Sequence, residues 1–233
     1  MNKKTIALLL LICSTLIGGS VVGAHSNHAT QQELSVVVNG VQVQSGVNHI
    51  WSGKAYVSVD QFAKLFDQKA TISKDNKSVT FNGKTITDIR QHEGQMTAWV
   101  RELADAVHAQ SIPWDSDQNE VYVLALPEGT VQISPVVPAM GEHWSNPEAG
   151  DLPTGPIYGV YNGKLVFIEY MIAQEDFVNG KNHVNVAGMK GVPSPSIVQM
   201  DIEFQATGHE GFEVPHYDIH AYFITDEEQQ QIK

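Results

Sequence analysis

The sequence predicts an α+β protein, in which a small repeated helix-strand-strand module is followed by a mainly antiparallel β barrel or sandwich. Three observations lead to this prediction. Apolar residues recur at helical spacing in two windows of the first half. Runs of alternating apolar and polar residues, bounded by Asn-Gly and other polar turns, dominate the second half. Five prolines and three glycines between residues 133 and 156 separate the two patterns and exclude long regular elements there.

The first 24 residues are typical of a signal peptide. They combine a basic start with an apolar run from Ile6 to Ile17 and small residues up to Ala24. We therefore expect a secreted or cell-envelope-associated protein, cleaved near Ala24, with residues 25–33 as a tail. The apolar run is too short for a membrane span, so no transmembrane anchor is predicted. Lipidation of Cys13 stays open, although Ile12 stands where a lipoprotein leader has a small residue.

The composition limits the partners and the metal ligands. Without Lys3 and Lys4, which leave with the signal, 12 basic residues face 26 acidic ones. Such an acidic balance repels nucleic acid and anionic membranes, so neither is expected as a partner. Cys13 is the one cysteine and leaves with the signal as well. The mature chain then has no disulfide or thiolate, and any metal must be held by nitrogen and oxygen donors.

Residues 34–130 are predicted to form the first domain. The Asn39-Gly40 pair between two β-prone runs predicts a hairpin. Two short amphipathic helices follow forty-one residues apart, each leading into a strand, a polar turn and a second strand. The helix positions are Val59, Phe62, Ala63 and Phe66, and then Val100, Leu103, Ala104 and Val107.

The order of these segments resembles the copper amine oxidase N-terminal-like (stalk) domain of bacterial envelope proteins. The resemblance covers residues 34–126 and rests on Val36-Val37-Val38-Asn39-Gly40, Ala55-Tyr56-Val57-Ser58-Val59 and the stretch from Ala70 to Phe81. It implies a small exported module used for display, wall association or protein contacts. It implies no amine oxidase activity, because the chain lacks the Asn-Tyr-Asp/Glu motif and the length of the catalytic domain.

Residues 131–233 are predicted to form a β-rich domain. The Asn162-Gly163 pair between Ile157 and Ile172 gives the strongest hairpin signal of the chain. Residues 197–204 alternate apolar and polar side chains, which is typical of a strand with one solvated face and needs no chemistry to explain it. The chain ends in a strand predicted over residues 216–224, with Tyr217, Ile219, Ala221 and Phe223 on the face that we expect to be core.

The last strand carries the best candidate for a functional site. The two-residue period of a strand puts His216, Asp218 and His220 on one face, where both rings can reach one ion. Glu169 lies in an apolar strand, where a carboxylate needs a partner. With His143, these residues predict a site for Zn, Cu, Fe or Mn whose ligands are His143, Glu169, His216 and His220. Asp218 is expected to accept a ring N–H and orient a ligand.

Four segments of this half resemble an uncharacterised family of exported bacterial β-domains, over residues 137–223. They are Met140-Gly141-Glu142-His143-Trp144, Gly155-Pro156-Ile157-Tyr158-Gly159, Val166-Phe167-Ile168-Glu169-Tyr170-Met171 and Pro215-His216-Tyr217-Asp218-Ile219-His220-Ala221-Tyr222. The resemblance implies a shared site without an assigned activity. Ala221 replaces a Phe common in that family, on the face away from the candidate ligands.

Several alternatives stay open. The histidines of the last strand could be the polar face of an edge strand, and the protein a non-enzymatic envelope or self-associating protein without a metal. A site with three ligands would suit catalysis and one with four a structural role, so the sequence does not decide whether the protein is an enzyme. A Ser/His/Asp hydrolase ranks low, since the chain has no Gly-x-Ser-x-Gly motif. His183 and His209, in loops, are expected to be solvated. A cell-wall or envelope protein is the expected partner, with a homo-oligomer as an alternative.

Overall fold

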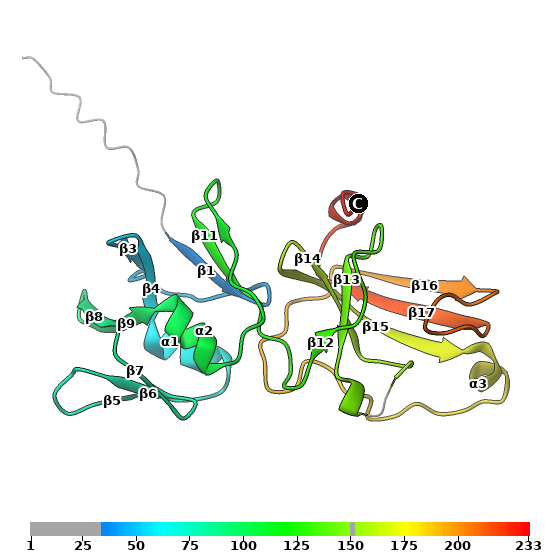
Figure 1. The fold of residues 1–233 in the computed structure, drawn as a ribbon, viewed down its shortest axis with the longest axis horizontal. Coiled ribbons are helices and arrows are strands. Elements are labelled where there is room, and N and C mark those ends of the chain that lie inside the picture. The colour runs from blue at the N-terminus through cyan, green and yellow to red at the C-terminus, as the bar shows by residue number, and fades with distance from the viewer. Residues whose placement is uncertain (1–33, 150–151) are drawn as a thin grey trace, which may run out of the picture. The chain divides into compact units, whose positions relative to one another are not determined.

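The computed structural model describes residues 34–149 and 152–233 (Figure 1). These residues form seventeen strands and four α-helices, and no α-helix among them is longer than seven residues. The predicted α+β class is therefore wrong, because the fold is predominantly β. The predicted signal peptide, Cys13 and the tail lie outside the described residues. Across both described ranges, no helix is long and apolar enough to cross a membrane.

The first half is built from three small sheets. One has the order β10-β11-β1-β2, a second the order β3-β4-β9-β8 and a third the order β5-β6-β7. Their strands are β1 (Ser35–Val38), β2 (Val41–Gln42), β3 (His49–Trp51), β4 (Lys54–Ser58), β5 (Thr71–Ile72), β6 (Val79–Phe81), β7 (Lys84–Ile86), β8 (Ile89–His92), β9 (Gln95–Trp99), β10 (Trp114–Asp115) and β11 (Glu120–Val123). The predicted hairpin at Asn39-Gly40 is confirmed, since β1 and β2 pair and both turn residues have positive φ.

The helical spacing of the sequence does produce helices, but they are short. Helices α1 (Val59–Leu65) and α2 (Val100–Ala106) have seven residues each. Both end in the same way, because Asp67 and His108, two residues beyond the last helical one, have φ of 53° and 55°. The apolar spacing correctly located the helices. However, two helices of about two turns each, among eleven strands, are too little helix for an α+β module.

The two helix units are packed across each other. α1 follows β4 and α2 follows β9, and these two strands are antiparallel partners, with Val57 opposite Ala98. Each helix contacts the strand of the other unit as well as its own. The resulting core contains Phe62 and Leu103, one from each helix, and both are fully buried.

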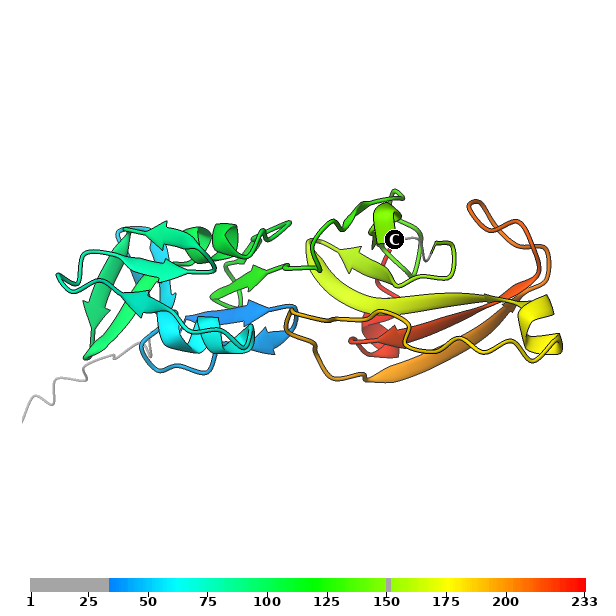
Figure 2. The same cartoon turned by 90° about the horizontal axis from the view of Figure 1, so that it is seen from below.

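The second half is a single six-stranded sheet with the order β12-β13-β14-β15-β17-β16. Figure 2 shows the strong curvature of its long strand over residues 164–173, in yellow-green. All of its pairs are antiparallel, as predicted. The sheet curves into a half-barrel with β12 and β16 as free margins, so the predicted barrel is found in part, as an open sheet that does not close. Its strands are β12 (Val131–Gln132), β13 (Glu142–Ser145), β14 (Ile157–Tyr161), β15 (Lys164–Ala173), β16 (Gln199–Gln205) and β17 (His216–Tyr222). Short helices follow β13, β15 and β17: the 3-10 helix η1 (Pro147–Ala149), α3 (Gln174–Val178) and α4 (Asp226–Gln229).

The predicted hairpin at Asn162-Gly163 joins β14 to β15 and is confirmed. A hydrophobic cluster contains residues of both halves, among them Val37 and Tyr122 beside Tyr158 and Ile168. The division of the chain into domains 34–130 and 131–233 stays a prediction.

The two faces of the last strands are used in an unexpected way. On β17, His216, Asp218 and His220 are at most 1% exposed, so the polar face is the more buried one. On β16 the apolar residues Met200, Ile202 and Phe204 are exposed, as is Glu203, whereas Asp201 is half-buried. The reason is the register, because cross-strand partners share a face and Asp201 lies opposite His220. The concave side of the half-barrel therefore holds the ionisable groups of both strands.

Candidate metal site

Two neighbouring clusters of ionisable side chains occupy the concave face of the second sheet. Strand β17 contributes His216, Asp218 and His220 at every second position, as the sequence predicts. The three side chains do not meet at one point, because successive positions on one face of a strand are about 6.6 Å apart. Asp218 and His216 belong to one cluster, and His220 to the other.

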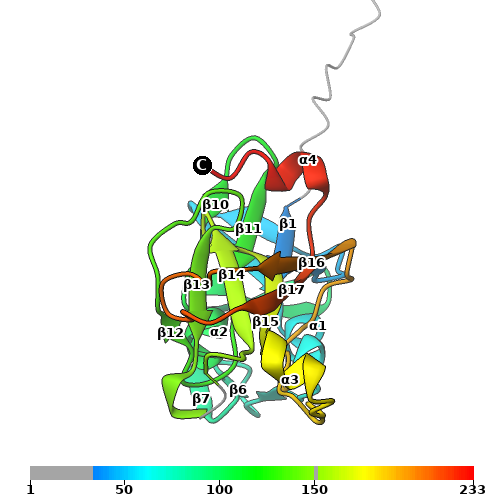
Figure 3. The same cartoon turned by 90° about the vertical axis from the view of Figure 1, so that its right-hand side faces the viewer.

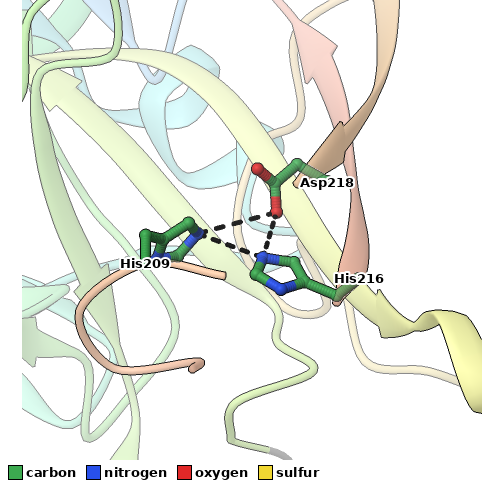
Figure 4. A group of neighbouring side chains, drawn as sticks. All are labelled: His209, His216 and Asp218. Carbon is green, nitrogen blue, oxygen red and sulfur yellow. Dashed lines mark hydrogen bonds and ion pairs between the residues drawn. The ribbon is translucent and has the colours of Figure 1, made fainter. Parts of the chain in front are cut away.

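The first cluster consists of His209, His216 and Asp218 (Figure 4). Nε2 of His216 lies 3.0 Å from Oδ1 of Asp218 and 3.2 Å from Nε2 of His209. Nε2 of His209 lies 3.8 Å from the same carboxylate oxygen. His216 and Asp218 are buried, whereas the His209 side chain is 44% exposed and opens the cluster to solvent.

His209 reaches the cluster because the β16–β17 connection folds back on β17. Residues His209 and Phe212 exchange two backbone hydrogen bonds across a tight turn with Gly208 and Gly211 at positive φ. The ring of Phe212 then stacks on that of His216, with centroids 4.4 Å apart. These contacts hold the tip of the loop over the strand.

The hydrogen bonds of the two rings determine which nitrogen carries the proton. Nδ1 of His216 lies 2.6 Å from the carbonyl oxygen of Val214, and Nδ1 of His209 lies 3.1 Å from that of Glu210. A carbonyl oxygen can only accept, so each Nδ1 must donate its hydrogen. In neutral rings both Nε2 atoms then carry lone pairs, and these are the two atoms that face Asp218.

Asp218 adds a third acceptor to this cluster. Neither of its carboxylate oxygens has a hydrogen-bond donor, although both are buried. Such an arrangement is costly unless a cation occupies the centre or a ring takes up a second proton. A point equidistant from three atoms separated by 3.0, 3.2 and 3.8 Å lies about 2.0 Å from each, which is the usual Zn–N and Zn–O bond length. The cluster therefore has the dimensions and donor chemistry of a three-ligand metal site.

The second cluster is centred on Glu169, which is 2% exposed. Its Oε1 lies 3.2 Å from Nε2 of His220 and its Oε2 lies 3.8 Å from Nε2 of His143. Pairing of β15 with β17 puts Glu169 directly opposite His220. Gly159 lies between His143 and Phe167 in the pairing of β13, β14 and β15. The space without a side chain at Gly159 is filled by the Phe167 ring, which packs on both histidines.

The pKa values of the two histidines in the second cluster are shifted in opposite directions. Burial lowers the pKa of His143, and the nearby Glu169 offsets this only in part. Nδ1 of His143 lies 2.9 Å from Ser134 Oγ, whose own hydrogen goes to the Pro135 carbonyl, so the ring donates here. Burial also opposes the charge of His220, but the hydrogen bond and charge of Glu169 outweigh it and raise its pKa. Glu169 thus lies closer to the ring whose pKa is raised than to the ring whose pKa is lowered, at 3.2 Å from His220 and 3.8 Å from His143.

The structure thus distributes the predicted ligands over two places. His143, Glu169 and His220 lie together, whereas His216 lies with Asp218 and His209. Glu169 does have the partners that its apolar surroundings require. Asp218 was expected only to orient a ligand, yet its oxygen stands in a ligand position. Metal binding itself stays a prediction.

His209 is the residue that sequence reasoning missed. It was expected to be solvated because it lies in a Gly-rich loop. The signal that could have found it is the Gly208-His209-Glu210-Gly211 turn, which sends the chain straight back toward His216. His183, also expected to be solvated, has its side chain 21% exposed and its Nε2 3.3 Å from the Asp176 carboxylate.

Comparison with known proteins adds little to this description. No protein-family model matches the chain, and no curated protein matches it. Among solved structures, the chain is similar to a hypothetical protein from Thermus thermophilus, with 19% identity and a TM-score of 0.38, over 41% of this chain and 88% of that one. A similarity of this size carries no functional argument, so the geometry of the site has to carry the proposal.

Proposed function

We propose that this is an exported, cell-envelope protein whose second half binds one divalent transition metal ion through His209, His216 and Asp218. The observation that carries the proposal is the convergence of Nε2 of His209, Nε2 of His216 and Oδ1 of Asp218, while both Nδ1 atoms face carbonyl oxygens. Two imidazoles and a carboxylate are ligands that suit Zn, Fe, Mn or Cu. The backbone carbonyls on both Nδ1 atoms are the supporting contacts usual for metal-bound histidine.

Three ligands leave at least one coordination position free on the side of His209, where the cluster meets solvent. A water molecule bound there would be acidified by the ion, so the arrangement is compatible with hydrolytic or oxygen chemistry. Export and the stalk-like character of residues 34–130 are part of the proposal and rest on the sequence alone.

The competing proposal is a protein without a metal, in which a protonated His216 pairs with Asp218. The same 3.0 Å contact supports it, because an imidazolium Nε2–H could donate to the carboxylate. In that case His209 is incidental, and the protein acts through contacts at the cell envelope. The two proposals differ in whether the exposed His209 matters.

Isothermal titration of the dialysed protein with Zn²⁺ and Mn²⁺ separates these proposals. His25 and His28 in the predicted tail are replaced by Ala throughout, so that the tail binds nothing. We expect one ion per chain, and we expect His209→Ala to weaken binding by more than about 100-fold, the upper end of what losing a supporting residue costs. His183→Ala is the matched control, a loop histidine outside the cluster. The absence of stoichiometric binding, or equal binding by the His209 variant, would exclude the metal.

A further inference from the structure

Strand β16 is a free margin of the second sheet (Figures 1 and 3). It has seven residues and pairs with β17 alone among the described strands. The backbone groups on its other side therefore have no strand partner within the described ranges. Such a margin is a template on which another strand can pair.

The convex face of β16 is apolar and exposed. Met200, Ile202 and Phe204 are 51%, 65% and 45% exposed, and Val198 just before them is 54% exposed. The same face of the neighbouring strands β14 and β15 is covered by the segment around residues 187 and 188. Tyr158 and Tyr170 donate hydrogen bonds to the carbonyl oxygens of Gly188 and Ala187 in this segment. That covering segment leaves β16 bare. A contiguous apolar row of this kind is typical of an interaction surface.

The concave face of the same strand is acidic. Asp201 and Glu203 alternate with the apolar residues, and β16 contains no Lys, Arg or Pro. These are the residues that protect most free strands from pairing. The strand thus presents a hydrophobic row on one face and two carboxylates on the other, so the protection it has against pairing is purely anionic.

The charges of β16 indicate which strand can pair with it. A second copy, paired antiparallel about Ile202, would bring Asp201 opposite Glu203 of its partner, twice in each dimer. Like charges directly opposite each other are destabilising, and the chain carries a net charge of −12. An incoming strand with basic residues at those positions and apolar residues between them would match both faces.

We propose that β16 is a docking edge for an extended segment of another protein in which apolar and basic residues alternate. The segment adds a seventh strand to the sheet. Its apolar side chains extend the row of Met200, Ile202 and Phe204, and its basic side chains face Asp201 and Glu203. This inference does not depend on the metal, since none of the β16 residues belongs to the His209 cluster.

Fluorescence anisotropy with two labelled nine-residue peptides tests the proposal on the full, metal-free chain. One peptide alternates Val and Lys, and the other alternates Val and Glu. We expect the Lys peptide alone to bind, with an affinity that falls as salt is added. Asp201→Asn combined with Glu203→Gln should remove the discrimination between the two peptides.

The Ile202→Lys variant breaks the apolar row and places a cation among the apolar side chains of the docked peptide, so binding should fall at least about tenfold. Ile202 is exposed, so the variant should fold, which circular dichroism checks. The matched control is Ile50→Lys, at a 46% exposed Ile in the marginal strand β3. The proposal is overturned if neither peptide binds, or if Ile202→Lys binds as well as the parent. It is also overturned if sedimentation velocity shows a dimer that Ile202→Lys abolishes, because the occupant is then a second copy.

Discussion

Replacing Asp218 by Asn should have opposite effects on the metal-free and the metal-loaded protein. In the metal-free protein the buried carboxylate of Asp218 has no hydrogen-bond donor, and when the ring of His216 is neutral it faces the lone pair of Nε2 at 3.0 Å. A buried polar group without a hydrogen bond costs about 1–3 kcal/mol, and more when it is charged. Asn has the same size, and its NH₂ group can donate to the ring. The metal-free variant should therefore be more stable than the parent by about 1–3 kcal/mol.

In the metal-loaded state, the parent should be more stable than the Asp218→Asn variant. An ion at 1,000 times its dissociation constant stabilises the parent by about 4.1 kcal/mol, which exceeds the advantage of the metal-free variant. The variant lacks the anionic ligand and should gain little. For a chain of this size, 1 kcal/mol shifts the melting temperature by about 2–4 °C. The variant should thus melt several degrees above the parent with chelator and below it with saturating Zn²⁺.

Thermal and urea unfolding followed by circular dichroism, with chelator and with Zn²⁺, measures both differences. Asp117→Asn is the control, because Asp117 is exposed in a turn outside the site. A variant that is less stable than the parent in chelator would refute the reasoning. It would mean that Asp218 already pairs with a protonated His216, as the proposal without a metal requires.

Three further predictions concern the packing and the charges. Phe167→Ala should lower the free energy of unfolding by about 3–5 kcal/mol in urea, since the ring is fully buried against His143 and His220. Gly159→Ala should be destabilising by about 1–3 kcal/mol, because its Cβ would overlap the Phe167 ring, and the loss should shrink in a Phe167→Ala background. Burial opposes the ionisation of Asp88, but hydrogen bonds from Lys54 and Tyr56 outweigh it and hold its pKa below the usual value of 3.8. Its contribution is present above that pH and is lost as the pH falls through the lowered pKa, so Asp88→Asn should cost about 1 kcal/mol at pH 7 and flatten the acid limb of the stability curve.

Local sequence signals predicted local structure well. The Asn-Gly pairs located two hairpins because a two-residue turn with positive φ allows few other residues. The apolar spacing located two helices, but it could not give their length, which left-handed residues after each helix determine. The fold class was wrong because the predicted helix units contain more strand than helix.

For the candidate site, the sequence predicted which residues share a strand face but not which residues form a cluster. The period of β17 correctly put His216, Asp218 and His220 on one face, and the apolar surroundings of Glu169 correctly indicated that it needs a partner. Which residues share a cluster depends on the register of β15 with β17 and on the path of the loop that carries His209. Neither is encoded in local spacing. The exposure of the apolar row on β16 could not be predicted for a similar reason, since alternation alone does not say which face of a strand is buried.

The crossed packing of the two helix units means that the first half has to fold as one cooperative body. Because α1 rests on β9 and α2 rests on β4, removal of either unit would expose the buried surface of the other. Neither unit would therefore be a sensible truncation on its own. A fragment that ends between the two helix units should therefore be unfolded, even though each unit contains a complete copy of the repeated sequence pattern.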